Sequence, residues 1–506
     1  MEWFLFLADM EKVQVAVVGS GFGALTAAAL LAKAGLQVSV LEMNKYPGGC
    51  ASTYKRKGYW FETGATTLVG LDEDMPLKYL LDVTGIDVSP LRLKVPMQVR
   101  LTDGTYITRY NDLEDWIQEA ERVFGQQGQR PFWETCFAIS QKVWRTSLRQ
   151  LSFPFSSFSD LGSAIKNFKW EQLGLIPLAF QSLTRLLAKH NLIENHRFIE
   201  FLDQQLLITA QNKHQDVNVL FGATALCYTL YGNYYVPGGL RQLALATVRS
   251  LEQNGARLLY KHQVNSIQSQ QNGTYLLSTS KGDMEAEFVV AGLPLNNVAR
   301  LFKDQSIQQS VQNYVMQSDK VNSALTWSIA FERTGSEKQV LHHQVHVPGG
   351  VPFVGSESIF ISLSHPLDDQ RAPAGICLAA VSTHVPHPAA NYIDKKEELE
   401  QWVVQFLAQQ GFLMPDKVLY VQAATPGAWI KWTGREWGQV GGYPQYLSIK
   451  PWQMKDARLD GKKAYVCGDT VYPGQGIPGV CLGGIIAAQK LLRDHFPAKV
   501  SLLRQR

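Results

Sequence analysis

Short apolar runs alternate with a helical pattern at the beginning of the chain. Residues 15–18 and 38–41 form two mainly apolar runs of strand length, separated by a segment rich in alanine and leucine. Strand-length runs on either side of a helical segment indicate a βαβ unit and a parallel sheet. Similar runs at 257–260, 263–267, 275–278 and 287–292 predict that the chain later returns to the same sheet.

The middle of the chain has a different periodicity. Residues 100–230 are dominated by apolar positions three or four apart, which predicts an inserted helical region. Residues 322–332, 358–364, 375–383 and 417–423 alternate or run apolar, which predicts a second, largely antiparallel sheet. We therefore expect an α/β protein with two interleaved domains. The nucleotide-binding domain is predicted at 13–100, 235–300 and 455–495, and a domain for substrate and membrane contact at 101–234 and 301–454.

A glycine-rich loop follows the first strand. It reads Gly19-Ser20-Gly21-Phe22-Gly23-Ala24 and leads directly into the helical segment. Gly19 permits a tight turn, Gly21 lets the backbone approach a pyrophosphate, and Ala24 is small enough for close packing of the helix on the strand. The helix N-terminus adds free N–H groups and a positive dipole end for phosphates. The loop therefore predicts a dinucleotide site.

Three further segments strengthen this prediction. Glu42 ends the second strand, near the spacing of roughly 20 residues at which an acidic residue binds ribose. Gly48 and Gly49 follow shortly after it. More than 400 residues later, Gly468-Asp469 precedes a Gly/Pro-rich turn that ends in Gly479-Val480 and leads into a helix expected from Leu482. We expect one dinucleotide, FAD, to be held by both ends of the chain.

Composition narrows the remaining possibilities. A chain of 506 residues favours two domains, and a net charge of +4 without a basic cluster does not predict a nucleic acid partner. Six scattered cysteines without a C-x-x-C motif indicate reduced thiols in the cytoplasm, with Cys481 as a buried apolar residue. His342, His343 and His346 lie in a polar stretch that we expect to be a solvated loop, so no metal site is predicted.

One segment admits two interpretations. Residues 151–187 combine many aromatic and aliphatic side chains with Lys166, Lys169 and Arg185. This pattern fits an apolar surface in a membrane interface with lysines at the headgroups, or a pair of core helices interrupted at Pro177. No uncharged apolar stretch has the length of a transmembrane helix. We therefore expect a peripheral protein on the cytoplasmic side of a membrane, with residues 3–7 as a second contact.

These motifs together resemble a known family. Residues 15–70, the segment from Gly468 to Val480, and the shorter runs 424–427 and 235–239 are similar to the carotenoid desaturase and isomerase family of FAD-dependent oxidoreductases, nearest its 3,4-desaturase branch. The departures are Ala24, where glycine is commoner, and the 291–294 segment. The resemblance implies a Rossmann-type FAD domain like that of amine oxidases and prenyl-protein dissociation inhibitors.

The resemblance also implies roles for individual residues. Gly19, Gly21 and Gly23, with Ser20 and Ala24 in the same loop, would hold the pyrophosphate, and Glu42 would bind the adenosine ribose. Gly48 and Gly49 would lie along the pyrophosphate or ribityl chain, and Val264 would meet the adenine through its backbone. Gly468 and Asp469 would bind phosphate or ribityl, while Gly479 and Val480 would flank the isoalloxazine on one side and Gly64 and Ala65 on the other. No catalytic base is implied.

The expected reaction is desaturation of a carotenoid or related polyene by hydride transfer to the flavin, with oxygen or a quinone as the electron acceptor. The alternatives are a carotenoid cis–trans isomerase or retinol-type saturase that uses reduced FAD, a flavin amine oxidase, and a flavin-free lipid-binding carrier. The intact Gly19-Ser20-Gly21 and Asp469 argue against the carrier.

Overall fold

The first sheet is built around parallel strands from distant parts of the chain. The computed structural model describes residues 10–64, 66–335, 340–386, 388 and 392–503. Five strands run parallel, namely β10 (Arg257–Tyr260), β2 (Val38–Glu42), β1 (Glu11–Val18), β13 (Gly282–Ala291) and β19 (Ala464–Val466). The antiparallel strands β12 (Tyr275–Thr279) and β11 (Val264–Ser269) continue the sheet beyond β13. The predicted return of the chain to this sheet is confirmed.

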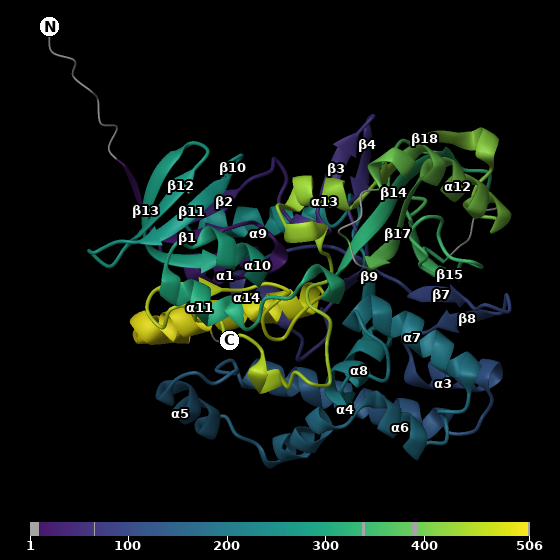
Figure 1. Ribbon diagram of the computed structural model, residues 1–506, viewed down its shortest axis with the longest axis horizontal. Helices are drawn as coiled ribbons and strands as arrows, with labels where there is room; N and C mark the ends of the chain where they lie inside the picture. Colours follow the sequence, from purple (N-terminus) through teal and green to yellow (C-terminus); the bar gives the residue numbers. More distant parts are fainter. Residues whose placement is uncertain (1–9, 65, 336–339, 387, 389–391, 504–506) are drawn as a thin grey trace, which may run out of the picture.

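Helices cover both faces of this sheet (Figure 1). One face packs against α1 (Phe22–Lys33), α2 (Pro76–Thr84), α9 (Arg241–Gln253) and α14 (Ile477–His495). The other face meets α10 (Leu295–Leu301) and α11 (Gln305–Gln312). Every residue of α1 except Lys33 is buried, because its alanines let neighbouring helices approach closely. α14 begins at Ile477 rather than at Leu482, since Gly476 ends the turn and Pro478 is well accommodated in a first helical turn.

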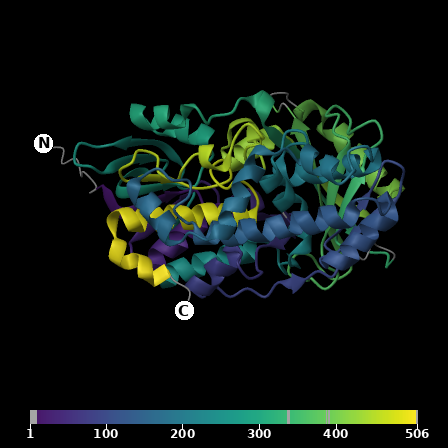
Figure 2. The same cartoon turned by 90° about the horizontal axis from the view of Figure 1, so that it is seen from below.

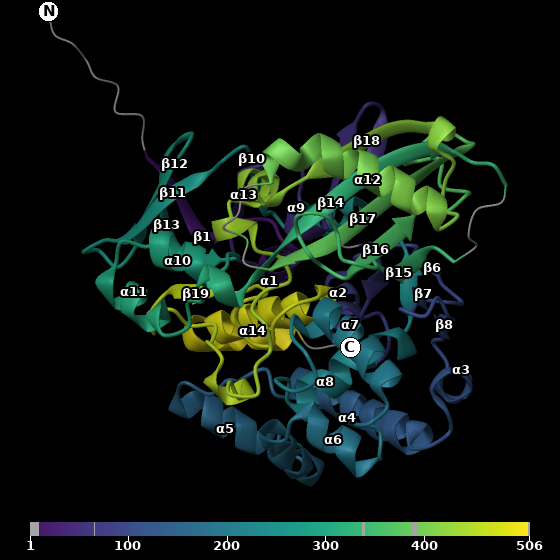
Figure 3. The ribbon, with the colours of Figure 1, turned by 45° about the vertical axis from the view of Figure 1, so that its right-hand side comes forward.

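The second sheet lies on the opposite side of the molecule, at the upper right of Figure 1. Its strand order is β18 (Val418–Ala424), β14 (Asn322–Glu332), β17 (Ile376–Pro386), β16 (Ser358–Leu363), β15 (His342–His346), β7 (Met97–Arg100) and β8 (Tyr106–Arg109). All neighbours are antiparallel except β15 and β7. Figure 3 shows α12 (Lys396–Gln409) across the outer face of this sheet.

The three histidines predicted in a solvated loop belong to this sheet. His342, His343 and His346 lie in β15, where His342 and His343 are each 1 % exposed. The loop prediction is wrong because the side chains alternate between two covered faces of the sheet. His342 and Gln344 face a cavity, while the ring of His343 packs against Phe412 on the α12 side.

The predicted helical insertion forms a separate layer, along the lower edge of Figure 1 and across the front of Figure 2. It contains α3 (Leu113–Phe124), α4 (Gln129–Arg149), α5 (Phe158–Lys166), α6 (Leu183–Lys189), α7 (His196–Ala210) and α8 (Val219–Leu226). A 3₁₀ segment, η2 (Trp170–Phe180), joins α5 to α6. Within the described residues, no helix is both long enough and apolar enough to cross a bilayer.

Short elements connect the layers. The hairpin of β3 (Thr53–Arg56) and β4 (Tyr59–Glu62) lies between the two large sheets, and β5 (Leu68–Val69), β9 (Asn233–Tyr235) and β6 (Leu91–Arg92) form a small third sheet. Helix α13 (Pro426–Thr433) follows β18 and brings the chain back toward the first sheet. The cavity described below lies where these layers meet.

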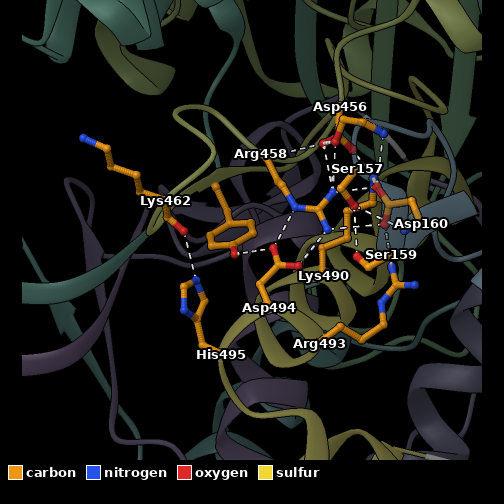
Figure 4. A network of polar contacts seen from close by, with 12 residues as sticks. Ser157, Ser159, Asp160, Asp456, Arg458, Lys462, Lys490, Arg493, Asp494 and His495 are labelled. Carbon is orange, nitrogen blue, oxygen red and sulfur yellow. Dashed lines mark hydrogen bonds and ion pairs between the residues drawn. The ribbon is translucent and has the colours of Figure 1, made fainter. Parts of the chain in front are cut away.

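A buried network of charges joins α5 to α14 (Figure 4). Arg458 donates to Asp160 over 2.7 Å and to Asp494 over 2.6 Å, and the ammonium of Lys490 lies 3.6 Å from Asp160 and also binds Asp456. The side chains of Asp160 and Lys490 are completely buried. This network fixes the otherwise exposed α5 against the cofactor domain.

Acid should weaken this network. Burial opposes ionisation of Asp160 and Asp494, but the hydrogen bonds and charge of Arg458, together with Lys490 at Asp160 and Tyr465 at Asp494, outweigh it, so both carboxyl pKa values are lowered. A carboxyl group with a lowered pKa stabilises the fold at every pH above its ordinary pKa of about 3.9. This stabilisation is lost as the pH falls toward the pKa of the group in the folded protein. The thermal midpoint should therefore fall with acidification below about pH 5, and Asp160→Asn should have a flatter dependence. The same slope in both proteins would contradict a contribution from Asp160.

Candidate cofactor and substrate site

The glycine loop lies at the N-terminus of α1, at the carboxyl end of β1. α1 has no acidic residue in its first turn and no side chain that caps it, so its first backbone N–H groups are free for an anion. A Cβ on Gly21 would meet no atom within 4 Å, which means that the backbone faces open space at this point. The loop therefore has the shape and polarity that a pyrophosphate requires.

A single cavity of about 1170 Å³ joins the predicted cofactor residues. Every predicted position that the structure describes lines it: Gly19, Ser20, Gly21, Gly23, Ala24, Glu42, Gly48, Gly49, Gly64, Val264, Gly468, Asp469, Gly479 and Val480. Ala65 lies outside the described residues. The two ends of the chain are in direct contact, because a Cβ on Gly23 would lie only 3.0 Å from the Val480 carbonyl oxygen. The specific atoms that each residue contacts on FAD stay predictions.

Glu42 is tied to the glycine loop. Its carboxylate accepts hydrogen bonds from the Ser20 backbone N–H at 2.9 Å and the Ser20 hydroxyl at 2.5 Å, and from the Asn44 N–H at 2.7 Å. These bonds hold an almost completely buried carboxylate at the cavity wall. The arrangement leaves about one acceptor site for a ribose hydroxyl, since an ionised carboxylate has about four and three are used here.

Asp469 has a partner that the sequence did not reveal. Nη2 of Arg435 donates to both carboxylate oxygens, at 2.6 and 2.7 Å, and the two side chains are each 12 % exposed. Burial alone would lower the pKa of Arg435, but the charge and hydrogen bonds of Asp469, together with contributions from Cys50 and Tyr443, outweigh it and raise the pKa. Arg435 thus places a permanent cation in the cavity wall beside Cys50, close to where the phosphates are predicted. Arg435 lies just after α13, and no sequence motif marks it as a cofactor-site residue.

The residues present fit a bound dinucleotide. Asn297 Oδ1 and Trp429 Nε1 belong to cavity-lining residues, and within the described parts of the chain these buried atoms have no hydrogen-bond partner. Such atoms are costly to bury unless a ligand completes their bonding. Gly64 is covered by the indole of Trp429, whose Cη2 would be 3.3 Å from an added Cβ. The cavity wall therefore offers hydrogen-bond acceptors and donors, a cation, and backbone that a bound dinucleotide can approach closely.

Cys481 belongs to the core and does not line the cavity. Cys481 is completely buried between α1 and α14, where it accepts a hydrogen bond from the Thr26 hydroxyl at 3.4 Å, and burial raises the pKa of its thiol to about 12. The interpretation of Cys481 as a buried residue is confirmed. Across the described ranges, no group of three or more His, Cys, Asp or Glu residues is arranged to hold a metal ion.

Beyond the cofactor residues the cavity becomes mainly apolar. Met97, Trp144, Phe221 and Tyr228 line this part. The exposed side chains of Phe155 and Ile176 line it as well, and we place its entrance there. Nine large hydrophobic side chains are exposed in this region: Phe155, Phe158, Leu161, Ile165, Phe168, Trp170, Leu173, Ile176 and Phe180. Six of these nine also line the cavity, so its entrance is itself apolar.

We expect Glu42→Ala to weaken FAD binding by about tenfold or more, because a hydrogen bond to a charged group contributes roughly 1.5–3 kcal/mol. Titration of the apoprotein with FAD, followed by flavin fluorescence, measures the effect. Ser20→Ala is the control, since it removes a bond that holds Glu42 but keeps the carboxylate. Unchanged affinity in Glu42→Ala would mean that the residue only ends its strand.

Comparison with known proteins shows which family has this architecture. The family model described as flavin containing amine oxidoreductase matches residues 25–492. Prolycopene isomerase 2 of an Oncidium hybrid cultivar is 24 % identical, covering 98 % of this chain and 86 % of the relative. The 4,4'-diapolycopen-4-al dehydrogenase of Metabacillus indicus is 22 % identical, covering 96 % and 98 %.

Among solved structures, putrescine oxidase bound to putrescine has the same fold. It superposes with a TM-score of 0.61 at 14 % identity, covering 95 % of this chain and 99 % of that structure. The predicted α/β fold with a Rossmann-type FAD domain and a substrate domain of sheet and inserted helices is thereby confirmed. The chain belongs to the flavin-containing amine oxidoreductase family and is an FAD-dependent oxidoreductase.

Proposed function

We propose that this protein oxidises a long, apolar polyene of the carotenoid type. The observation that carries the proposal is the continuous cavity, which joins the predicted dinucleotide-binding residues to exposed apolar side chains. The names of the prolycopene isomerase and diapolycopenal dehydrogenase relatives support the same substrate class. A rod-like hydrocarbon suits a wall formed mainly by aliphatic and aromatic side chains.

The chemistry that FAD supplies is acceptance of a hydride from a polyene C–H bond, while the adjacent carbon releases a proton. The protein positions the substrate and keeps water out of the site. The apolar wall excludes water. Arg435 and the helix N-terminus at Gly21 supply positive potential for the phosphates, and the helix N-terminus at Gly476 supplies it for the flavin ring. We assign no side chain as the base.

A cis–trans isomerase that uses reduced FAD is the second candidate, because four of the relatives that span this chain are named prolycopene isomerase. Pigment analysis of cells that make this protein and contain carotenoid substrates distinguishes the two. Desaturation lengthens the conjugated system and shifts absorption to longer wavelength, whereas isomerisation changes retention without adding a double bond. Pigments identical to those of matched cells that do not make this protein would contradict both candidates.

Two further alternatives have less support. An amine substrate carries a cation, and the carboxylates of the cavity wall, among the residues that the structure describes, are those of Glu42 and Asp469. Both already bind protein groups, at Ser20 and Arg435. A flavin-free carrier would have no use for the arrangement of Gly21, Gly49 and Asp469 around one cavity.

We also propose that the protein binds the surface of a membrane, on its cytoplasmic side, through residues 155–180. Phe158, Ile165 and Trp170 are 93, 78 and 81 % exposed, and a contiguous apolar surface of this kind is uncommon on a monomeric soluble protein. Lys166 and Lys169 are exposed beside them and can reach lipid headgroups. A substrate dissolved in the bilayer could then enter the cavity without crossing water. Residues 3–7, the second predicted contact, lie outside the described residues.

The triple variant Phe158→Ser, Ile165→Ser, Trp170→Ser should lose liposome binding. Each buried apolar side chain contributes about 25 cal/mol per Å² removed from water, and this part is not screened by salt. Co-sedimentation with liposomes at low and high salt measures the loss. A matched control replaces Leu367, Ile393 and Leu502, which are exposed elsewhere, by serine. Equal binding of both triple variants would assign the attachment to another surface.

A further inference from the structure

The second sheet presents a polar face to the cavity. Thr326, Ser382 and Gln344 line the cavity and belong to one cross-strand row, because Thr326 pairs with Ser382, Ser382 with Phe360, and Phe360 with Gln344. The alternate residues of the same strands face α12 and form an aliphatic and aromatic core. A cavity for a pure hydrocarbon does not require such a polar wall.

His342 lies in the next row of this wall, opposite Ser362. Its Nδ1 is 2.9 Å from the Ser362 hydroxyl, which in turn is 2.6 Å from the Thr66 hydroxyl. The ring stacks on Phe360 with centroids 6.1 Å apart and an interplanar angle of 13°. Nε2 is buried and, in the described part of the chain, has no hydrogen-bond partner.

Two of the neighbouring polar side chains, Gln344 and His384, are already paired. Gln344 accepts from Gln205 and donates to the Gln204 carbonyl oxygen at 3.2 Å. His384 Nε2 is 2.9 Å from the amide nitrogen of Gln211. The imidazole of His342 is therefore fixed by the protein on one side and left with an unused hydrogen-bonding nitrogen on the other.

The charge state of His342 restricts its ligand. Burial lowers the pKa of the imidazole to about 3, so the ring is neutral at ordinary pH. A neutral imidazole has one donor and one acceptor nitrogen, and it cannot compensate a carboxylate or an ammonium group in a buried site. An uncharged oxygen atom, as in a hydroxyl or carbonyl group, fits this position best.

We propose that His342 binds an uncharged oxygen function near one end of the polyene, so that the enzyme prefers oxygenated polyenes over hydrocarbons. This inference rests on the proposed function and narrows its substrate class. The apolar length of the molecule would occupy the entrance side of the cavity, and the oxygen would meet Nε2 at the polar sheet. A group that binds this atom removes the cost of burying it unpaired.

Two matched acyclic polyenes test the proposal. Lycopene and rhodopin, its monohydroxy derivative, are titrated in detergent into the FAD-loaded protein, and tryptophan fluorescence quenching reports the dissociation constants. The wild type should bind rhodopin about five- to tenfold more tightly, the effect of one hydrogen bond. His342→Phe should lose this preference without weaker binding of lycopene, and His342→Gln should keep part of it.

The outcomes separate this inference from the proposed function. Equal affinity of the wild type for both polyenes, or a preference that persists in His342→Phe, would overturn the role of His342. The proposed function as a polyene enzyme would remain. Equal weakening of both polyenes in His342→Phe would assign the residue a structural role and overturn the inference. Failure of either polyene to bind the wild type would overturn the proposed function itself.

Discussion

Replacement of Gly484 by alanine is expected to disrupt the contact between α1 and α14 and to impair FAD binding. A Cβ at Gly484 would lie 2.3 Å from the Gly23 carbonyl oxygen and 2.8 Å from the Thr26 Cβ, so the helices must move apart. Overpacking of this kind costs about 1–3 kcal/mol and occasionally more. The N-termini of both helices face the dinucleotide site, so the displacement should also weaken FAD binding.

Urea unfolding and FAD titration of the same preparation measure both effects. Gly162→Ala is a matched control, because this glycine is also helical and an added Cβ would meet nothing within 4 Å. Alanine is favoured over glycine in a helix by about 1 kcal/mol at either site, so the difference between the variants reports the clash. Equal stabilities would show that α1 and α14 adjust without cost.

The second large effect is expected from Asp160→Asn. This change removes the negative charge that faces Arg458 and Lys490, and it leaves two buried cations with fewer partners. Breaking a buried ion pair from one side costs about 3–5 kcal/mol, and the remaining partners Asp456 and Asp494 favour the lower end of this range.

Glu114→Gln provides the comparison, since Glu114 is half exposed and pairs with Arg130 on the surface. An exposed pair contributes about 0–1 kcal/mol, so this variant should unfold near the wild-type urea concentration. Asp160→Asn should also detach α5, which limited proteolysis near residues 155–180 would detect. If the two variants lose equal stability, the buried network does not anchor α5.

The sequence predicted the cofactor side of this molecule well, because a dinucleotide site depends on backbone shape that glycine spacing encodes locally. Gly21 and Glu42 could be assigned from a βαβ pattern alone, and their neighbours now line one cavity. Arg435 was missed because its importance comes from Asp469, a partner 34 residues away that only the fold brings close.

The substrate side was harder to predict for a physical reason. The His342-x-Gln344-x-His346 segment has the period of a strand, but polar residues in a strand usually indicate exposure to solvent. Here the polar face borders an internal cavity, which no single-segment pattern reveals. Segment 151–187 combines both patterns that its sequence allowed. Nine of its large apolar side chains are exposed and six of these line the cavity, whereas Leu183, Leu186 and Leu187 are buried in the core.

We propose that FAD held by both ends of the chain oxidises a polyene that enters through the apolar entrance. The most direct test of this reaction is a single turnover without oxygen, in which oxidised, FAD-loaded protein is mixed with liposomes that contain lycopene or a more saturated precursor. We predict loss of the visible flavin absorption together with formation of one new double bond per flavin reduced. An unchanged flavin spectrum and unchanged polyene, with a second sample of pre-reduced protein equally inactive, would contradict the account.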